Sequence, residues 1–280
     1  MLKGVTAHPG WTSDPTCAWW APWADALRGT GLDFVRFDIN WQDTAAIAKT
    51  QAICRMLSAM TPFVSLGSSG SSWQRPDPED YAAVAADIAR VLPAGGVLEI
   101  WNEPNVVPKF WPGPAEPGLY GLLCNGAYQA IKSQAPHVTV AAGCFLAADA
   151  AFLSGFMETG GHAFDWLAVH PYTKGLNAPP DDPDAAGAGR MSFCNALTVC
   201  RQALDNVGRR GHPIAITEVG WPVDPAGSSH YRAALQLARS ANVVAFGAYG
   251  LGDHPSGRDA YSLFNEDRSP RLAMSAFLSA

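Results

Sequence analysis

The sequence predicts a single α/β domain folded as a (β/α)8 TIM barrel, and three observations support this prediction. The chain has 280 residues, close to the ~250 that one such barrel typically takes. Short apolar runs alternate with amphipathic helical patterns along its whole length, as in a parallel sheet covered by helices. Eight such runs occur, the number that closes a barrel, and no linker divides residues 1–280.

The expected strands are short apolar runs that are nearly free of charge, as strands buried on both faces should be. In chain order they cover Gly4–His8, Phe34–Ile39, Pro62–Leu66, Val97–Trp101, Val138–Gly143, Trp166–His170, Ile214–Thr217 and Val243–Tyr249.

The expected helices place apolar residues at helical spacing. They cover Trp20–Arg28, Thr44–Met60, Asp80–Leu92, Tyr120–Gln134, Asp149–Thr159, Ser192–Val207, Ser229–Ser240 and Pro270–Ser279. In the second of these, Ile47, Ile53, Cys54 and Leu57 should share one face. The third opens with Asp77–Pro78–Glu79, a helix start signal.

Composition excludes several classes of partner. Charged residues make up 16% of the chain, below the average of about 25%, and the net charge is −6 without a basic cluster. Nucleic acid is therefore not an expected partner. No apolar run reaches the ~20 residues of a membrane span, so no membrane insertion is expected. The start MLKGVTAHPGW lacks the apolar core of a signal peptide. We therefore expect a soluble chain. If it acts outside the cell, it would be exported without a signal peptide of this kind, be carried by a phage, or be a domain trimmed from a longer protein.

The cysteines indicate neither a metal nor a cofactor. There are six, with no Cys-x-x-Cys pair, so zinc and thioredoxin-type sites are not expected, and no cofactor is predicted. An even number leaves disulfide bonds open without fixing a pairing.

Two short motifs contain the candidate catalytic residues. LEIWNEPN at Leu98–Asn105 and IAITEVGWP at Ile214–Pro222 are apolar, strand-like runs that end in Glu103 and Glu218. A carboxylate beside an apolar strand is costly unless something uses it. Two carboxylates at strand ends are what a double-carboxylate glycosidase needs.

Further polar residues are expected to meet these glutamates, because the C-terminal ends of barrel strands surround one pocket. They are His8, Arg36, Asp38, Asn102, His170, Tyr172 and Tyr249. The charge of Arg36 is expected to lower the pKa of Glu218 and keep it ionised. Repulsion from Glu218, with partial burial, should keep Glu103 protonated.

Tryptophan is abundant near loop signals. Of the ten in the chain, eight lie in such places: Trp11, Trp19, Trp20, Trp41, Trp73, Trp101, Trp111 and Trp221. Core filling is one role for these residues, and stacking on the C–H face of a sugar is another. Trp111 and Trp221, each a few residues from a candidate glutamate, are the ones we expect to contact substrate.

Together these motifs resemble the clan GH-A glycoside hydrolases, which are retaining (β/α)8 enzymes, and family 39 most of all. The resemblance includes WNEPN, TEVGWP, VRFDINW (Val35–Trp41), FDWLAVHPY (Phe164–Tyr172) and YSLFNEDRSPR (Tyr261–Arg271). It implies that Glu103 is the general acid/base and Glu218 the nucleophile. It also implies that Asn102 contacts the hydroxyl next to the reacting carbon, and that His170 and Tyr172 orient the carboxylates.

One departure leaves the sugar open. Many clan members have a tryptophan at the end of strand 8, whereas this chain reads AFGAYGLGD, with Tyr249 nearest. Loops at Val106–Gly118 and Thr173–Arg190 favour a cleft for more than one sugar, hence an oligo- or polysaccharide substrate. The Ala/Gly/Pro/Trp-rich composition hints at an actinobacterial or phage origin, and so at a cell-wall or capsule glycan.

Three alternatives to glycoside hydrolysis by two carboxylates remain open. A metal-dependent barrel hydrolase would want paired histidines on strand 1, which offers only His8. A non-catalytic carbohydrate-binding barrel would usually have lost a carboxylate, and both are present. A transglycosylase would use the same site and the same covalent intermediate.

Overall fold

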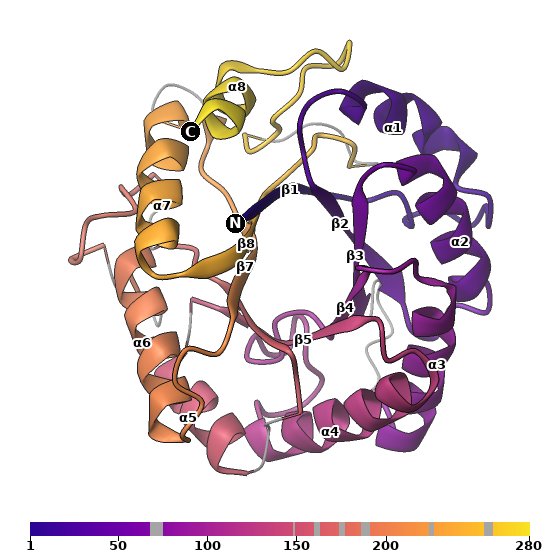
Figure 1. The fold of residues 1–280 in the computed structure, drawn as a ribbon, viewed down its shortest axis with the longest axis vertical. Coiled ribbons are helices and arrows are strands. Elements are labelled where there is room, and N and C mark those ends of the chain that lie inside the picture. The colour runs from indigo at the N-terminus through magenta and orange to yellow at the C-terminus, as the bar shows by residue number, and fades with distance from the viewer. Residues whose placement is uncertain are drawn as a thin grey trace.

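The computed structural model shows eight parallel strands closed into a barrel in the order β1 to β8, each paired with its sequence neighbours and β8 with β1 (Figure 1). It describes residues 1–67, 75–147, 149–159, 163–173, 177–185, 191–223, 227–254 and 260–280. The strands are β1 (Leu2–Ala7), β2 (Phe34–Asn40), β3 (Thr61–Gly67), β4 (Val97–Ile100), β5 (Thr139–Leu146), β6 (Trp166–His170), β7 (Ile214–Val219) and β8 (Val243–Ala248). The predicted (β/α)8 fold is confirmed.

Helices alternate with these strands and surround the barrel (Figure 1). They are α1 (Ala21–Leu27), preceded by the short 3-10 turn η1 (Ala18–Trp20), α2 (Ala46–Leu57), α3 (Pro78–Val91), α4 (Pro117–Gln134), α5 (Ala150–Glu158), α6 (Phe193–Asn206), α7 (Ser228–Ser240) and α8 (Leu272–Ser279). Asp77 caps α3 by accepting from the backbone N–H groups of Glu79 and Asp80, as its sequence predicted.

One expected core position is wrong. Ile47, in the first turn of α2, is 39% exposed, while Ile53 and Leu57 are buried. The buried face of α2 contains Ala46, Thr50, Ile53 and Leu57 at helical spacing, and Ile47 lies outside that stripe.

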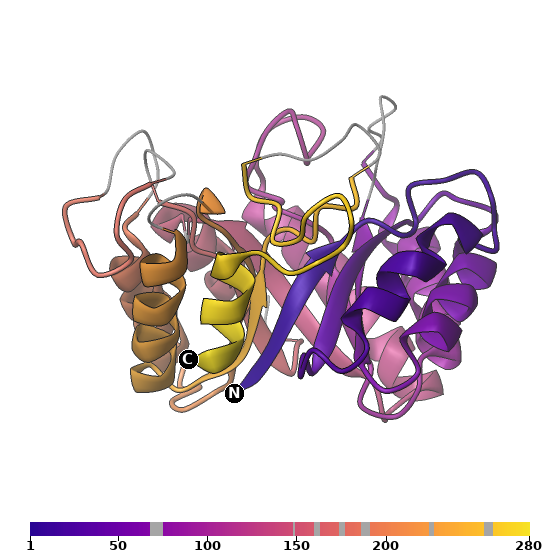
Figure 2. The same cartoon turned by 90° about the horizontal axis from the view of Figure 1, so that it is seen from above.

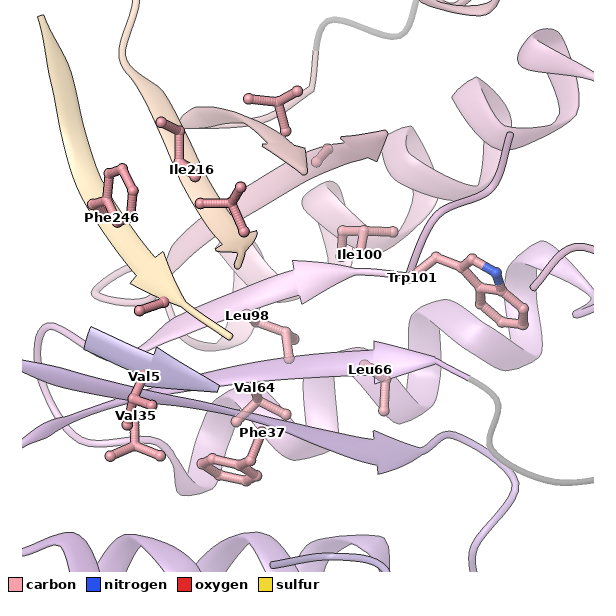
Figure 3. Packing of buried hydrophobic residues seen from close by; sticks show 14 of the residues in the cluster. Val5, Val35, Phe37, Val64, Leu66, Leu98, Ile100, Trp101, Ile216 and Phe246 are labelled. Atoms are coloured by element: carbon pink, nitrogen blue, oxygen red, sulfur yellow. The ribbon is translucent and has the colours of Figure 1, made fainter. Parts of the chain in front are cut away.

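Side chains of each strand alternate between two buried layers. The larger apolar cluster joins strand residues to helix residues; Figure 3 shows Val35 and Phe37 of β2, and Leu98 and Ile100 of β4, which belong to it. The smaller cluster contains only strand residues: Phe34, Phe63, Val97, Ala141, Cys144, Ala168, Ala215 and Ala245. Because successive side chains point to opposite faces, this second cluster fills the barrel interior.

The interior changes from apolar to polar along the strands. Near the N-terminal ends, the rings of Phe34 and Phe63 stack with centroids 3.9 Å apart. Two residues further along β2 and β4, the same inward face presents Arg36 and Glu99, both buried. Polar side chains therefore line the interior toward the strand C-termini. In side view, the longer loops extend from that end, opposite both chain termini (Figure 2).

Within the described ranges, none of the helices combines the length and apolar character that crossing a bilayer requires. All six cysteines have free thiols.

Candidate active site

A cavity of about 1070 Å³ opens at the C-terminal ends of the strands. It lies at the barrel face where the βα loops meet, as expected for this fold. Its lining includes seven of the residues predicted from the sequence: Glu103, Glu218, Asn102, Tyr172, His8, Tyr249 and Asp38. Two more, Arg36 and His170, lie directly behind this lining and are buried.

Glu103 and Glu218 lie side by side in this cavity. One carboxylate oxygen of each, together with a ring nitrogen of His170, lie within 4.8 Å of one another. Glu103 is 6% exposed and follows β4 in the left-handed backbone region, with φ of 47°. Residues other than glycine rarely adopt this backbone conformation, and those that do are often found in functional sites. The turn is fixed by a hydrogen bond from the Glu103 backbone N–H to the carbonyl oxygen of Cys144 on β5, 3.2 Å long.

Glu218 accepts a hydrogen bond on each carboxylate oxygen. Nη1 of Arg36 donates to Oε2, and the hydroxyl of Tyr172 donates to Oε1, both at 2.9 Å. Burial raises the pKa of the Glu218 carboxyl, although the charges of His170 and Arg36 lower it. The expected lowering by Arg36 is therefore present but smaller than the effect of burial, and the net direction is opposite to the one predicted from sequence.

Arg36 is the buried cation of the site, with a side chain 1% exposed. Besides Glu218, it donates through Nε to Glu99 at 2.6 Å and through Nη2 to Oδ1 of Asn102 at 2.8 Å. Burial opposes its charge, but the charges of Glu99, Glu218 and Asp38 raise the pKa of Arg36 well above its usual range. Because Arg36 holds Oδ1 of Asn102, the amide NH2 is the group that Asn102 can offer to a substrate.

His170 connects Glu103 to the interior. Its Nδ1 lies 3.0 Å from Oε1 of Glu103, and its Nε2 lies 3.1 Å from the hydroxyl of Thr217. Burial by itself would lower the pKa of His170. The hydrogen bond to Glu103, the charge of Glu218 and the interaction with Glu99 together raise it to about 9. The ring is therefore an imidazolium at neutral pH and donates from both nitrogens.

His8, which directly follows β1, lines the cavity and is held in place by Asp253. Its Nδ1 lies 3.2 Å from Oδ1 of Asp253, and its backbone N–H donates to Oδ2 at 2.7 Å. Burial lowers the pKa of His8, but the hydrogen bond and the charge of Asp253 raise it more, so the net direction is up. The His8 ring lies near those of Trp11, Tyr249 and His254.

Trp111 and Trp221 do not lie in the cavity, where their positions in the sequence predicted a contact with substrate. Both are 1% exposed and are absent from the described residues that line the cavity. Trp111 packs edge-on against Trp101 and Tyr120, and Trp221 against Tyr231. Each ring turns back toward the helix layer, where burial of its apolar faces is favourable. Of the eight tryptophans named above, Trp11 alone is among the described lining residues, and Trp73 lies outside the described residues.

Four contributing residues were not identified from the sequence: Ser65, Glu99, Thr217 and Asp253. Glu99 carried a usable signal, because it is a charged residue inside an apolar run. A strand buried on both faces can hold a charge only if a partner is buried with it. Ser65, Thr217 and Asp253 had no comparable signal.

The contacts of Glu103, His170 and Glu218 favour a carboxylate pair over a metal site, although their donor atoms lie close together. A metal ligand must be unprotonated, but His170 is an imidazolium. Both oxygens of Glu218 already face hydrogen-bond donors, one of them the Arg36 guanidinium, whose charge would repel a cation.

Comparison with known proteins finds similarity in structure but not in sequence. No family model matches the chain, and no curated protein matches it in sequence. A monomeric β-xylosidase from Caulobacter crescentus CB15 matches with a TM-score of 0.68 and 16% identity, over 98% of this chain and 66% of that one. An exo-β-1,4-mannosidase from Opitutaceae bacterium strain TAV5 matches with a TM-score of 0.73 and 15% identity, over 100% and 58%. A GH5-4 broad-specificity endoglucanase from Clostridium acetobutylicum matches with a TM-score of 0.64 and 15% identity, over 99% and 95%.

The chain thus spans two thirds or less of the xylosidase and the mannosidase and nearly all of the endoglucanase. At these identities the likeness concerns the fold. In fold, the chain is similar to the (β/α)8 glycoside hydrolases of the GH39 and GH5 (clan GH-A) type.

Proposed function

We propose that the protein is a retaining glycoside hydrolase with Glu218 as nucleophile and Glu103 as general acid/base. The observation that carries the proposal is the pair of carboxylate oxygens within 4.8 Å of one another in a cavity at the strand C-termini. Retaining enzymes hold their two carboxyl groups ~5–5.5 Å apart, whereas inverting enzymes leave ~6.5–9.5 Å for a water molecule. The close approach of the two groups favours retention.

In the first step, a lone pair of Glu218 attacks the anomeric carbon, and the bond to the leaving oxygen breaks. Glu103 transfers its proton to that oxygen, so that the leaving group departs as an alcohol. The donors Arg36 and Tyr172 fix the direction of the Glu218 carboxylate for this attack. The His170 imidazolium stabilises the Glu103 carboxylate that remains after the proton is transferred.

In the second step, Glu103 takes a proton from water, whose oxygen attacks the same carbon and releases Glu218. Two displacements at one carbon return the original configuration. Asn102 would donate from its amide to a sugar hydroxyl beside the reacting carbon, since Arg36 holds its oxygen.

The substrate class that fits this cavity is an oligo- or polysaccharide. A volume of about 1070 Å³ slightly exceeds the ~300–1,000 Å³ of small-molecule sites and leaves room for more than one sugar ring. The structural neighbours are named as a xylosidase, a mannosidase and an endoglucanase, so the fold itself favours no one sugar. The Ala/Gly/Pro/Trp-rich composition hints at an actinobacterial or phage origin. A bacterial cell-wall or capsule glycan outside the cell is therefore the candidate substrate.

A panel of aryl glycosides tests the proposal: glucoside, xyloside, galactofuranoside and arabinofuranoside. Proton NMR of the first-formed product on the best substrate should show the anomer of the starting glycoside, and Glu218→Gln should release no product. An inverted first product would rule out retention. Turnover by Glu218→Gln at the wild-type rate would place the chemistry elsewhere.

A further inference from the structure

Glu99 is a third carboxylate, buried beneath the two proposed catalytic ones. It lies within β4, is 2% exposed and is not among the described residues that line the cavity. It therefore cannot touch a substrate there. A buried carboxylate is costly unless its charge and its oxygens are satisfied. The partners of Glu99 show what its charge is used for.

The first oxygen of Glu99 connects it to the nucleophile. Oε2 accepts from Nε of Arg36 at 2.6 Å, and Nη1 of the same guanidinium donates to Glu218 at 2.9 Å. A guanidinium is planar and rigid, so fixing one edge fixes the direction of the other. Glu99 thereby sets the orientation in which Arg36 meets Glu218.

The second oxygen connects it to the acid/base. Oε1 accepts from the hydroxyl of Thr217 at 2.5 Å, and that hydroxyl lies 3.1 Å from Nε2 of His170. A threonine hydroxyl has one hydrogen, so Thr217 must accept from Nε2–H while it donates to Glu99. The other ring nitrogen, Nδ1, then faces Glu103 at 3.0 Å.

We propose that Glu99 is a positioning residue that orients both catalytic carboxylates, Glu218 through Arg36 and Glu103 through Thr217 and His170. The proposal rests on the function proposed above for Glu103 and Glu218. Glu99 is the described residue in which the two branches meet, because its oxygens bind one branch each.

The surroundings of Glu99 also keep its carboxyl ionised. Burial opposes ionisation of Glu99, but Arg36, His170 and a hydrogen bond from Cys144 on β5 bring the pKa of the carboxyl below its usual range. The charged groups that face His170 are Glu99 on β4, Glu103 after β4, Glu218 on β7 and Arg36 on β2. Removing the negative charge of Glu99 should therefore make the His170 imidazolium easier to deprotonate.

Glu99→Gln tests the proposal, because it keeps the size of the side chain and removes the charge. The matched control is Asp165→Asn, which removes a carboxylate paired with Lys132 directly before β6, at the opposite end of the barrel. Thr217→Val is a second variant of unchanged shape that cuts the His170 branch alone. Thermal unfolding first establishes that each variant is folded.

We expect Glu99→Gln to lower kcat on the best aryl glycoside by about 10- to 100-fold with KM changed less than about threefold, as when a residue behind the reacting groups is lost. In a proton NMR titration, the pKa of the His170 ring should fall from about 9 in both Glu99→Gln and Thr217→Val. Asp165→Asn should match wild type in both measurements. Should Glu99→Gln not fold, Thr217→Val decides by the same two readouts.

A folded Glu99→Gln with wild-type kcat, or with reduced kcat but an unchanged His170 pKa, would overturn the positioning role. Failure of the proposed function is separable from this. If wild type cleaves no glycoside of the panel, that function fails, while the titration of His170 still decides whether Glu99 fixes its charge.

Discussion

Nη1 of Arg36 lies 2.9 Å from Oε2 of Glu218, and this contact joins β2 to β7 across the barrel interior. With the hydroxyl of Tyr172 on the other oxygen, it leaves Glu218 little freedom to rotate. An attacking group held in one orientation loses less entropy on reaching the transition state. Burial raises the pKa of Glu218, whereas hydrogen bonds to its carboxylate oxygens lower it. The pH dependence of activity therefore shows which effect is larger.

The acid limb of kcat/KM should lie above the usual carboxyl range of about 4 to 4.5, because burial raises the pKa of Glu218. The proposed nucleophile must be ionised, so activity should be present above this pKa and should fall as pH drops through it. Tyr172→Phe removes a hydrogen bond to the charged form and should move the limb to higher pH. The check is a pH profile of both proteins on one substrate. A limb at or below the usual range, or one that Tyr172→Phe moves down, would contradict this prediction.

Glu218→Ala should lose at least about 10,000-fold in kcat/KM on every substrate, because no glycosyl-enzyme can form. Added azide fits the space left by the side chain and attacks the anomeric carbon directly. It should restore part of the activity and give a glycosyl azide of inverted configuration, identified by NMR. Azide rescue with retained configuration would exchange the roles of Glu218 and Glu103.

Glu103→Ala should instead discriminate between leaving groups. A dinitrophenyl glycoside needs no proton to depart, so the first step should proceed and the glycosyl-enzyme should accumulate for lack of a base. Pre-steady-state kinetics should therefore show a burst with this substrate, and azide should relieve the stall with retained configuration. Equal losses on dinitrophenyl and alkyl glycosides would argue against an acid/base role.

The tryptophans should separate into two groups. Trp221→Ala should destabilise the fold by about 3–5 kcal/mol, since a buried ring is removed from the core. Trp11→Ala should leave thermal stability nearly unchanged and raise KM, because Trp11 lines the cavity and is 39% exposed. Thermal unfolding and Michaelis–Menten kinetics on the same preparations make the comparison. If Trp221→Ala kept wild-type stability and raised KM, the result would indicate that Trp221 contacts the substrate and contradict a core role.

Features that depend on local pattern could be read from the sequence. Eight apolar runs of strand length fixed the number of strands, and β6 begins and ends where it was predicted. Glu103 and Glu218 were identified because each ends such a run, and strand ends meet at one face of a barrel. The gathering of Arg36, Asn102, His170 and Tyr172 around them follows from the same rule.

Features that depend on distant surroundings were decided by the tertiary structure. Whether Trp111 and Trp221 face the cavity or the helices depends on the path of a loop, which spacing in sequence does not encode. The direction of the Glu218 pKa depends on burial, which outweighs the charge of Arg36. Asp253 became the partner of His8 because the loop after β8 returns to the end of β1. The role proposed for Glu99 requires β2, β4 and β7 to be brought together, since a buried charge acts through neighbours that lie far away along the chain.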